Sequence, residues 1–331
     1  MWIGSRGWGV RVGWLWAAAA LVLAAGCGPR EDSPREERPR ESGAVRVVVS
    51  VPPLASLVRS MLPADAEVRV LVPPGGSPHG FAPSPSDIAA VARADLVVLV
   101  GMGIESGLPA SLHQGSRAIW MAEAVGVQAA ADHGHSHDDH GHAHGHGDEH
   151  AAHGGADPHL WLDPSLVEAF LPELAERVVG ALERAGASDA ETGAVGARLA
   201  ALLTEVRAVD GAYRERLAAH RGAVITTQHA AWSRLTDRYG LVVASEIQVA
   251  EQAEPSAGRM AEIVRTAEER GVRAVLTEPQ MNRAVAGRLA EQLGVPLGML
   301  DPLGTGDWTA MMRANLDALV AVLGGDADGG G

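Results

Sequence analysis

Histidines are concentrated in one stretch of the sequence, residues 132–164. Of the 14 histidines in the chain, nine fall at positions 133–153, among glycines and carboxylates. They are His133, His135, His137, His140, His142, His144, His146, His150 and His153. A tenth, His159, follows in the phrase Asp157-Pro158-His159-Leu160-Trp161-Leu162-Asp163-Pro164. Neutral imidazoles and carboxylates are common ligands of transition metals, so this stretch indicates metal binding.

Residues 132–156 contain too little apolar surface to offset the entropy of ordering them, which predicts a disordered surface loop. Two interpretations of its histidines stay open. They form either an accessory, low-affinity collector of metal ions or a solvated tract with incidental metal affinity. Imidazoles bind metals only when neutral, so capture by the loop should fade below about pH 6.5.

Four further residues have positions suited to one shared metal ion. His79 follows a predicted strand at 67–72, and His159 precedes a predicted helix. His229 comes two residues after a predicted strand at 223–227, and Asp301 directly follows one at 296–300. Ligands of parallel sheets bind beyond the carboxyl ends of the strands. Three imidazoles and one carboxylate would form the four-coordinate shell that is typical of Zn²⁺.

Each of the four also has an ordinary structural explanation. His79 is in a loop, where a solvated side chain is common. His159 could cap a turn, His229 could accept a backbone hydrogen bond at a helix start, and Asp301 could form a turn with Pro302. His113 and His220 have no comparable strand-end position, and both are predicted to be surface residues.

The elements that would position these residues alternate between short β-branched strands and amphipathic helices. This alternation predicts right-handed βαβ units and parallel sheets. In the first half, the expected strands are residues 44–51, 67–72, 95–100 and 117–120. The expected helices are residues 54–62 and 85–94, the second with Ser84 as its N-cap.

In the second half, the pattern predicts a helix over residues 164–185, bent at Pro172, and then a long helix over 189–219 that opens with a capping box at Ser188. The expected strands are residues 223–227, 241–244, 272–277 and 296–300. The expected helices are residues 230–239, 255–270, 283–293 and 308–323. The predicted fold is therefore α/β, with two lobes that each contain a parallel sheet flanked by helices, joined by one long rigid helix.

The N-terminal residues have the composition of an export signal. Arg6 and Arg11 precede an apolar run over 12–25, which is shorter than the roughly 20 residues of a membrane span. Leu23-Ala24-Ala25-Gly26-Cys27 resembles the lipobox of bacterial lipoproteins, which predicts lipidation of Cys27; an ordinary leader with an incidental cysteine is the alternative. As Cys27 is the only cysteine, disulfides and thiolate metal sites within the fold are excluded.

The predicted organisation divides the 331 residues into six segments. They are a signal peptide (1–26), a lipidated tether (27–43), an N-terminal lobe (44–186), a linking helix (187–220), a C-terminal lobe (221–323) and a disordered tail (324–331). Removal of the leader changes the formal charge from −14 to −16, because the leader holds two arginines and no acid. Such an acidic chain is not expected to bind nucleic acid.

Several phrases resemble those of the bacterial solute-binding proteins that carry zinc or manganese for ABC importers. Residues 72–79 with 84–87 are similar to the first ligand loop of that family, and residues 157–164 to its second. Glu254-Pro255-Ser256, Thr277-Glu278-Pro279-Gln280 and Leu300-Asp301-Pro302-Leu303-Gly304 resemble its C-terminal signatures. The resemblance covers residues 44–323. One departure is His229-Ala230-Ala231-Trp232, where the family usually has His-Asp-Ala followed by aromatics.

The resemblance implies an exported protein, in the periplasm or on the outer face of the cell membrane, that carries metal between its lobes. It implies His79, His159, His229 and Asp301 as ligands and an ABC permease with its ATPase as partner. We expect a monomer, anchored to the membrane through Cys27. Three nitrogens with one carboxylate favour Zn²⁺, and within this family a histidine-rich insertion marks the zinc members.

Three alternatives remain at this stage. The first is a manganese-specific member of the same family. The second is a zinc-buffering lipoprotein without a transporter. The third is a zinc hydrolase, for which Glu278 would be the nearest general base. The resemblance favours a transport protein without enzymatic activity.

Overall fold

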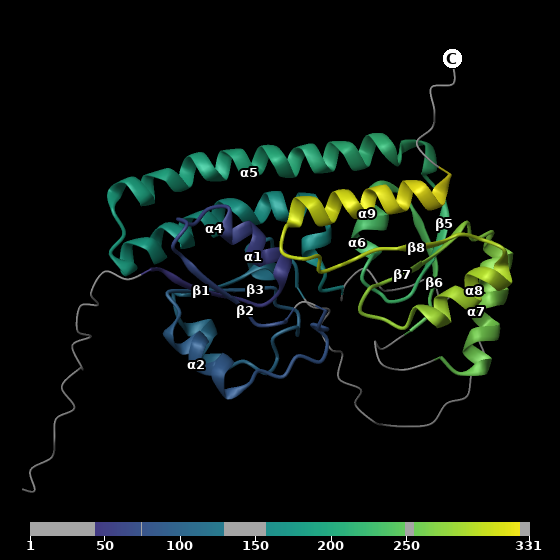
Figure 1. Ribbon diagram of the computed structural model, residues 1–331, viewed down its shortest axis with the longest axis horizontal. Helices are drawn as coiled ribbons and strands as arrows, with labels where there is room; N and C mark the ends of the chain where they lie inside the picture. Colours follow the sequence, from purple (N-terminus) through teal and green to yellow (C-terminus); the bar gives the residue numbers. More distant parts are fainter. Residues whose placement is uncertain (1–43, 74, 129–156, 249–254, 325–331) are drawn as a thin grey trace, which may run out of the picture. The chain divides into compact units, whose positions relative to one another are not determined.

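Two parallel four-stranded sheets form the framework of the protein (Figure 1). The computed structural model describes residues 44–73, 75–128, 157–248 and 255–324. The first sheet has the order β2-β1-β3-β4 and the second the order β6-β5-β7-β8. The strands of the first are β1 (Arg46–Val49), β2 (Glu67–Val70), β3 (Leu96–Leu99) and β4 (Ala118–Trp120). Those of the second are β5 (Val224–Thr227), β6 (Val242–Glu246), β7 (Ala274–Thr277) and β8 (Leu297–Met299).

Both sheets thus repeat one connectivity, in which the first strand of the lobe lies between the second and the third. Val47 pairs with Val68 on one side and Leu96 on the other, and Ile225 pairs with Val243 and Ala274. Because all strands of a sheet run in parallel, their carboxyl ends lie along one edge. The loops that carry His79 and His229 leave from those edges, so the sheet topology brings the predicted ligands toward a common region.

Helices cover the sheets and connect the lobes. They are α1 (Pro52–Arg59), α2 (Pro85–Arg93), α3 (Met121–Ala124), α4 (Pro164–Ala185), α5 (Asp189–Arg216), α6 (Ser233–Tyr239), α7 (Ala257–Arg270), α8 (Arg283–Leu293) and α9 (Trp308–Leu323). Short 3-10 turns are η1 (Ala110–Gln114), η2 (Leu160–Leu162) and η3 (Ala218–His220). Ser84 is the N-cap of α2 as predicted and forms a full capping box with Asp87, and the capping box predicted at Ser188 is present.

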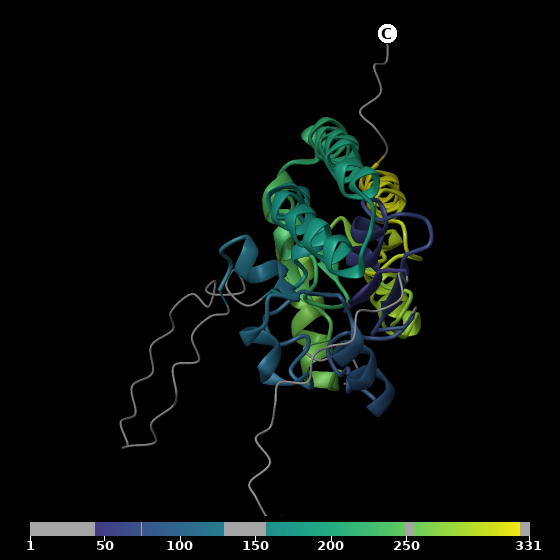
Figure 2. The same ribbon diagram turned by 90° about the vertical axis from the view of Figure 1, so that its left-hand side faces the viewer.

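The long predicted connector is confirmed as α5, whose 28 residues span about 42 Å. It lies alongside α4 in both views (Figures 1 and 2) and also packs against α9. The buried Tyr213 of α5 donates a hydrogen bond of 2.7 Å to the carbonyl of Met312 in α9. The helix therefore contacts elements of both lobes along its length.

Successive side chains of β1 point to opposite faces of the first sheet, as in any pleated strand, and both faces are buried. Val47 and Val49 belong to a large buried cluster, whereas Val48 faces a smaller one on the opposite side. The large cluster continues into the second lobe. There Trp161 Nε1 donates to the carbonyl of Pro302 (2.6 Å), and Trp308 Nε1 donates to the carbonyl of Trp161 (2.8 Å). The two lobes are thus joined by buried contacts as well as by α5.

Some details differ from the sequence predictions. α1 begins at Pro52 rather than residue 54, since the first helical turn does not need the missing proline N–H. Pro172 lies inside α4, as predicted. His220 was predicted at the surface, but it is only 6% exposed, because the η3 turn that follows α5 packs its side chain inward. His113 is exposed as predicted and stacks on Trp120.

Cys27, the nine histidines at 133–153 and residues 325–331 lie outside the described part of the chain, so the predictions made for them stay predictions, as do the domain boundaries. Among the helices that the structure describes, none has the length and apolarity needed to cross a membrane.

Candidate metal centre

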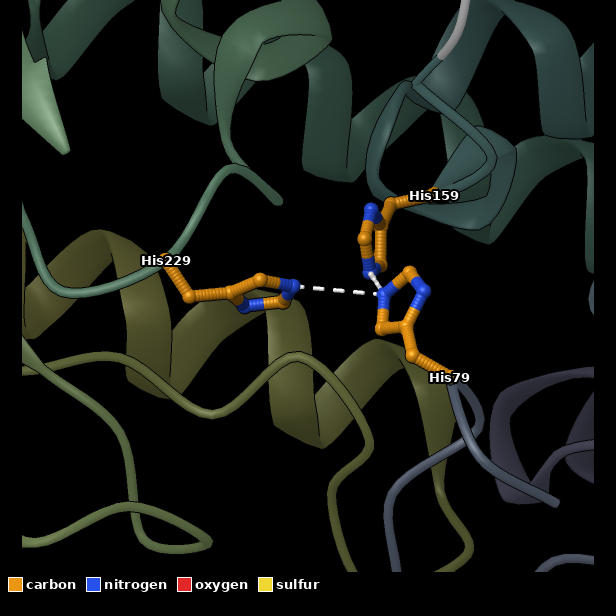
Figure 3. A group of neighbouring side chains, drawn as sticks. All are labelled: His79, His159 and His229. Atoms are coloured by element: carbon orange, nitrogen blue, oxygen red, sulfur yellow. Dashed lines mark hydrogen bonds between the residues drawn. The ribbon is translucent and has the colours of Figure 1, made fainter. Parts of the chain in front are cut away.

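Three of the four predicted ligands meet in the structure: His79, His159 and His229 (Figure 3). The Nε2 atoms of His79 and His159 are 3.0 Å apart, and those of His79 and His229 are 3.2 Å apart. Within the described residues, these three form the one cluster of His, Cys, Asp or Glu side chains whose ligand atoms all lie within 4.8 Å of one another. The structure therefore brings together three of the predicted imidazoles from positions 80 and 150 residues apart.

The three rings come from different kinds of segment. His79 lies in the loop after β2, and its side chain is exposed. Its backbone N–H donates to Ser77 Oγ at 3.1 Å. His159 directly precedes η2 and is 1% exposed. His229 comes two residues after β5 and is 7% exposed. Two ligands are thus fixed in the protein interior, and the third reaches them from the surface.

A carboxylate orients the ring of His159. Asp157 Oδ1 lies 2.7 Å from His159 Nδ1, and it also accepts the backbone N–H of His159 at 2.9 Å. A carboxylate acceptor places the proton of the neutral ring on Nδ1. The lone pair of His159 is therefore on Nε2, the atom that faces His79.

A second carboxylate does the same for His229. Glu278, which follows β7, places Oε1 and Oε2 at 3.0 and 3.1 Å from His229 Nδ1. Glu278 Oε1 also accepts the indole N–H of Trp232 at 2.9 Å, and the side chain is buried. This contact fixes the Nδ1–H form of His229, so its Nε2 lone pair also faces His79.

The convergence of these atoms suits a cation. Two Nε2 lone pairs point toward the Nε2 of His79, and a single N–H on that atom can be directed at only one of them. A metal ion would satisfy all three lone pairs at once. Zinc–nitrogen bonds of about 2.0–2.1 Å in a tetrahedral shell place nitrogens about 3.3–3.4 Å apart. The separations of 3.0 and 3.2 Å are close to that spacing.

The protonation equilibria favour neutral rings. Although His79 as a whole is exposed, its ring packs against the other two imidazoles, and this desolvation, followed by repulsion from His159 and His229, lowers the pKa of His79 to about 4. Burial also lowers the pKa of His159, although the hydrogen bond to Asp157 opposes it. For Asp157, burial acts to raise the pKa, but hydrogen bonds from His159 and Ser233 outweigh it and leave the pKa below its usual range. At neutral pH the site thus combines metal-ready imidazoles with an ionised carboxylate.

Asp301, the fourth predicted ligand, is not part of the three-imidazole group. Its Oδ1 accepts hydrogen bonds of 3.0 Å from Gln280 Nε2 and from the backbone N–H of Leu303. A cavity of about 10 Å³ adjoins His159 and His229 and has room for about one water molecule. Its other lining residues are Gly76, Ser77, Pro78, Glu278, Gln280, Pro302 and Leu303.

Sequence reasoning missed the supporting side chains. Asp157 was quoted only as part of a motif, although a carboxylate two residues before a candidate ligand is a usable signal. Glu278 was considered as part of a family signature and as a general base, but not as the partner of His229. Ser233, whose hydroxyl donates to Asp157 Oδ2 at 2.5 Å, gave no signal in the sequence.

Comparison with known proteins identifies the family. A model of the ZnuA family, described as zinc-uptake complex component A, periplasmic, matches residues 47–322. The zinc-binding protein AdcA of Streptococcus pyogenes serotype M3 is 28% identical over 295 residues, which cover 84% of this chain and 56% of AdcA. The chain thus spans about half the length of AdcA.

Two further matches cover almost the whole of the other protein. The high-affinity zinc uptake system protein ZnuA of Bacillus subtilis is 27% identical over 315 residues, which cover 91% of this chain and 94% of that protein. The periplasmic zinc-binding protein TroA from Treponema pallidum has the same fold, with a TM-score of 0.67 at 22% identity over 85% of this chain and 99% of TroA. Because the family model matches residues 47–322, which are most of this chain, the chain belongs to the ZnuA family, the family of zinc-uptake complex component A.

Proposed function

We propose that this protein binds one Zn²⁺ between its lobes, outside the cytoplasm, and delivers it to an ABC permease driven by an ATPase. The observation that carries the proposal is the convergence of three imidazole Nε2 atoms, two of them with the opposite ring nitrogen held by a carboxylate. In this proposal zinc is the cargo, and no covalent bond of a substrate is made or broken.

The donor set favours zinc over manganese. Three neutral imidazoles with at most one oxygen ligand match the preference of Zn²⁺, whereas Mn²⁺ prefers more oxygen ligands. Asp301 remains our proposed fourth ligand. AdcA and the ZnuA protein of Bacillus subtilis are both named for zinc, in agreement with this choice.

Capture is proposed to proceed from the buried ligands outward. His159 and His229 are oriented before zinc arrives, so little ordering entropy is lost when they bind. His79 is exposed and completes the three-nitrogen set from the surface. The low pKa of His79 and the lowered pKa of His159 favour neutral rings, so zinc has few imidazolium protons to displace there.

The geometry gives no support to the hydrolase alternative. A general base beside the metal needs an oxygen that can accept a proton from water. Both oxygens of Glu278 instead lie against His229 Nδ1, and one of them also accepts the Trp232 N–H. Glu278 is thus placed to orient a ligand.

The finer features proposed are a lipid anchor on Cys27, a monomeric state, and a collecting role for the histidines at 133–153. Mass spectrometry of membrane-extracted protein, with a Cys27→Ser variant as control, tests the anchor. Sedimentation with and without zinc tests the monomer.

Competition titration tests the metal site itself. Metal-free protein is titrated with zinc, and separately with manganese, in the presence of a chromophoric chelator that competes for the metal. It should bind one zinc ion tightly and prefer zinc to manganese. A His79→Ala, His159→Ala double variant should lose this site. Tighter manganese binding, or zinc binding that is unaffected in the double variant, would refute the proposal.

Deletion of residues 133–153 tests the collecting role separately. The deletion should remove additional, weaker zinc equivalents and leave the single tight site. If the tight site were lost as well, the histidine-rich segment would be part of it and not a collector.

A further inference from the structure

The carboxylate that orients His159 is itself held by an element of the second lobe. Asp157 Oδ2 accepts a hydrogen bond of 2.5 Å from Ser233 Oγ, at the start of α6. The next residue, Arg234, donates from Nε and Nη2 to the backbone carbonyl of Asp157 at 2.9 and 2.8 Å. Asp157 is therefore bound to α6 through both its side chain and its main chain.

The hydrogen bonds that hold Asp157 are expected to be strong and well directed. The acceptor is an ionised and buried carboxylate, only 6% exposed, and hydroxyl donors to carboxylates form shorter and stronger bonds than neutral pairs do. The paired donation from Arg234 fixes the direction of the carbonyl as well as its distance. Together, the three bonds leave Asp157 little freedom to rotate away from His159.

α6 has a second attachment that does not involve Asp157. Arg238 donates to Asp210 Oδ1 of α5 at 2.9 Å and to Ser165 Oγ of α4 at 2.8 Å. Tyr239 also donates to Asp210 Oδ1, at 2.9 Å. Because these bonds hold the C-terminal end of α6, loss of the Ser233 hydroxyl alone should not detach the helix.

We propose that Ser233 and Arg234 are positioning residues for metal binding: by holding Asp157, they fix the ring of His159, so that α6 of the second lobe sets the zinc affinity of a ligand in the first. The inference rests on the proposed function for its effect on zinc. Its structural part, the orientation of His159, also applies to the metal-free protein. Separation of α6 from η2 would release Asp157 and weaken His159 as a ligand, which couples lobe separation to zinc release.

The first test measures zinc affinity in the full-length chain by competition with a tight chelator. Ser233→Ala should weaken binding about tenfold, within the range of about 10–100-fold for loss of a group that supports a ligand. Ser233→Thr, which keeps the hydroxyl, should recover most of this loss. Ser256→Ala is the matched control, because Ser256 lies in the same lobe and its hydroxyl caps α7 by accepting the backbone N–H of Arg259.

A double-mutant cycle shows whether Ser233 acts through Asp157. In an Asp157→Ala background, Ser233→Ala should cause no further loss of zinc affinity. An equal loss in both backgrounds, or a loss in Ser233→Ala no larger than that in Ser256→Ala, would overturn the proposal.

Nitrogen-15 NMR of labelled histidines in the metal-free protein supplies a readout that a purely structural role would not change. The His159 signal, assigned by its absence in His159→Gln, should show the Nδ1–H form in the wild type and a mixture of both ring forms in Ser233→Ala and Arg234→Met. An unchanged signal would overturn the positioning role. If the signal changes as expected but wild-type protein binds no zinc tightly, the proposed function fails and the positioning role stands.

Discussion

The two lobes repeat one sheet order but present their histidines differently. In the first lobe His79 follows β2, an edge strand, and is exposed. In the second lobe His229 follows β5, an inner strand, and is buried against Glu278, which follows the neighbouring strand β7. An inner strand has a neighbour on each side, so a side chain at its end can be supported by the adjacent strand end. A ligand after an edge strand lacks one of these neighbours.

His159 shares the properties of His229 although it comes from the first lobe. Both are buried, and both have Nδ1 against a carboxylate. The proposed site therefore consists of a buried, oriented pair of imidazoles and one exposed imidazole, His79. This contrast predicts that the buried pair determines affinity and geometry, while His79 controls access.

Removal of a buried ligand should have the largest effect. His159→Ala and His229→Ala should each weaken zinc binding more than about 100-fold, beyond the loss of a supporting group. The loss of zinc affinity in His79→Ala should be about tenfold smaller than in either of these variants, because water can replace an exposed ligand. Chelator competition measures all three, with His113→Ala as the control for an exposed histidine away from the site. Equal losses for the three ligands would contradict the contrast.

Removal of the supporting carboxylates should have the next largest effect. Asp157→Asn and Glu278→Gln should each weaken zinc binding about 10–100-fold, since a neutral amide no longer fixes the proton on Nδ1. Glu262→Gln, an exposed glutamate paired with Arg259, is the control and should leave affinity unchanged. The account fails here if both variants bind zinc as tightly as the control.

The zinc affinity of the tight site should depend only weakly on pH. An imidazole with the ordinary pKa of about 6.5 is about nine-tenths protonated at pH 5.5 and cannot bind metal. The pKa of His79 is about 4, so its ring stays neutral at pH 5.5, and burial also lowers the pKa of His159. Zinc affinity of the tight site should therefore fall less than about tenfold between pH 7 and 5.5. If zinc affinity fell 100-fold or more over the same pH range, the imidazoles of the site would have ordinary pKa values and the prediction would be wrong.

The smallest effect on zinc binding is expected when the hydrogen bond that supports the exposed His79 is removed. Ser77 accepts the backbone N–H of His79, and a neutral hydrogen bond contributes about 0.5–1.5 kcal/mol. In an exposed loop the low end applies, so Ser77→Ala should weaken zinc binding only about threefold. A loss as large as that of Asp157→Asn would mean that His79 is held as firmly as the buried pair.

Much of the fold could be predicted because local signals coincide with the elements. β-branched runs predicted β1, β3 and β7, the Ser84 N-cap predicted the start of α2, and the Ser188 capping box predicted the start of α5. The short turns η1 and η2 have no such periodic signal. The burial of His220 depends on how the chain packs after α5, which a local pattern does not contain.

The site was predictable only in part for a similar reason. The positions of His79, His159 and His229 relative to strand ends and motifs identified the converging imidazoles. Their supporting groups depend on contacts between distant segments. Ser233 is 76 residues from Asp157, and Glu278 is 49 residues from His229, so sequence spacing could not pair them.

A crystal structure of the zinc-loaded chain, with anomalous diffraction recorded at the zinc edge, tests the central claim most directly. The account predicts one strong peak about 2.0–2.1 Å from the Nε2 atoms of His79, His159 and His229. A principal peak that contacts two or fewer of these rings, or that lies only among the histidines at 133–153, would contradict it.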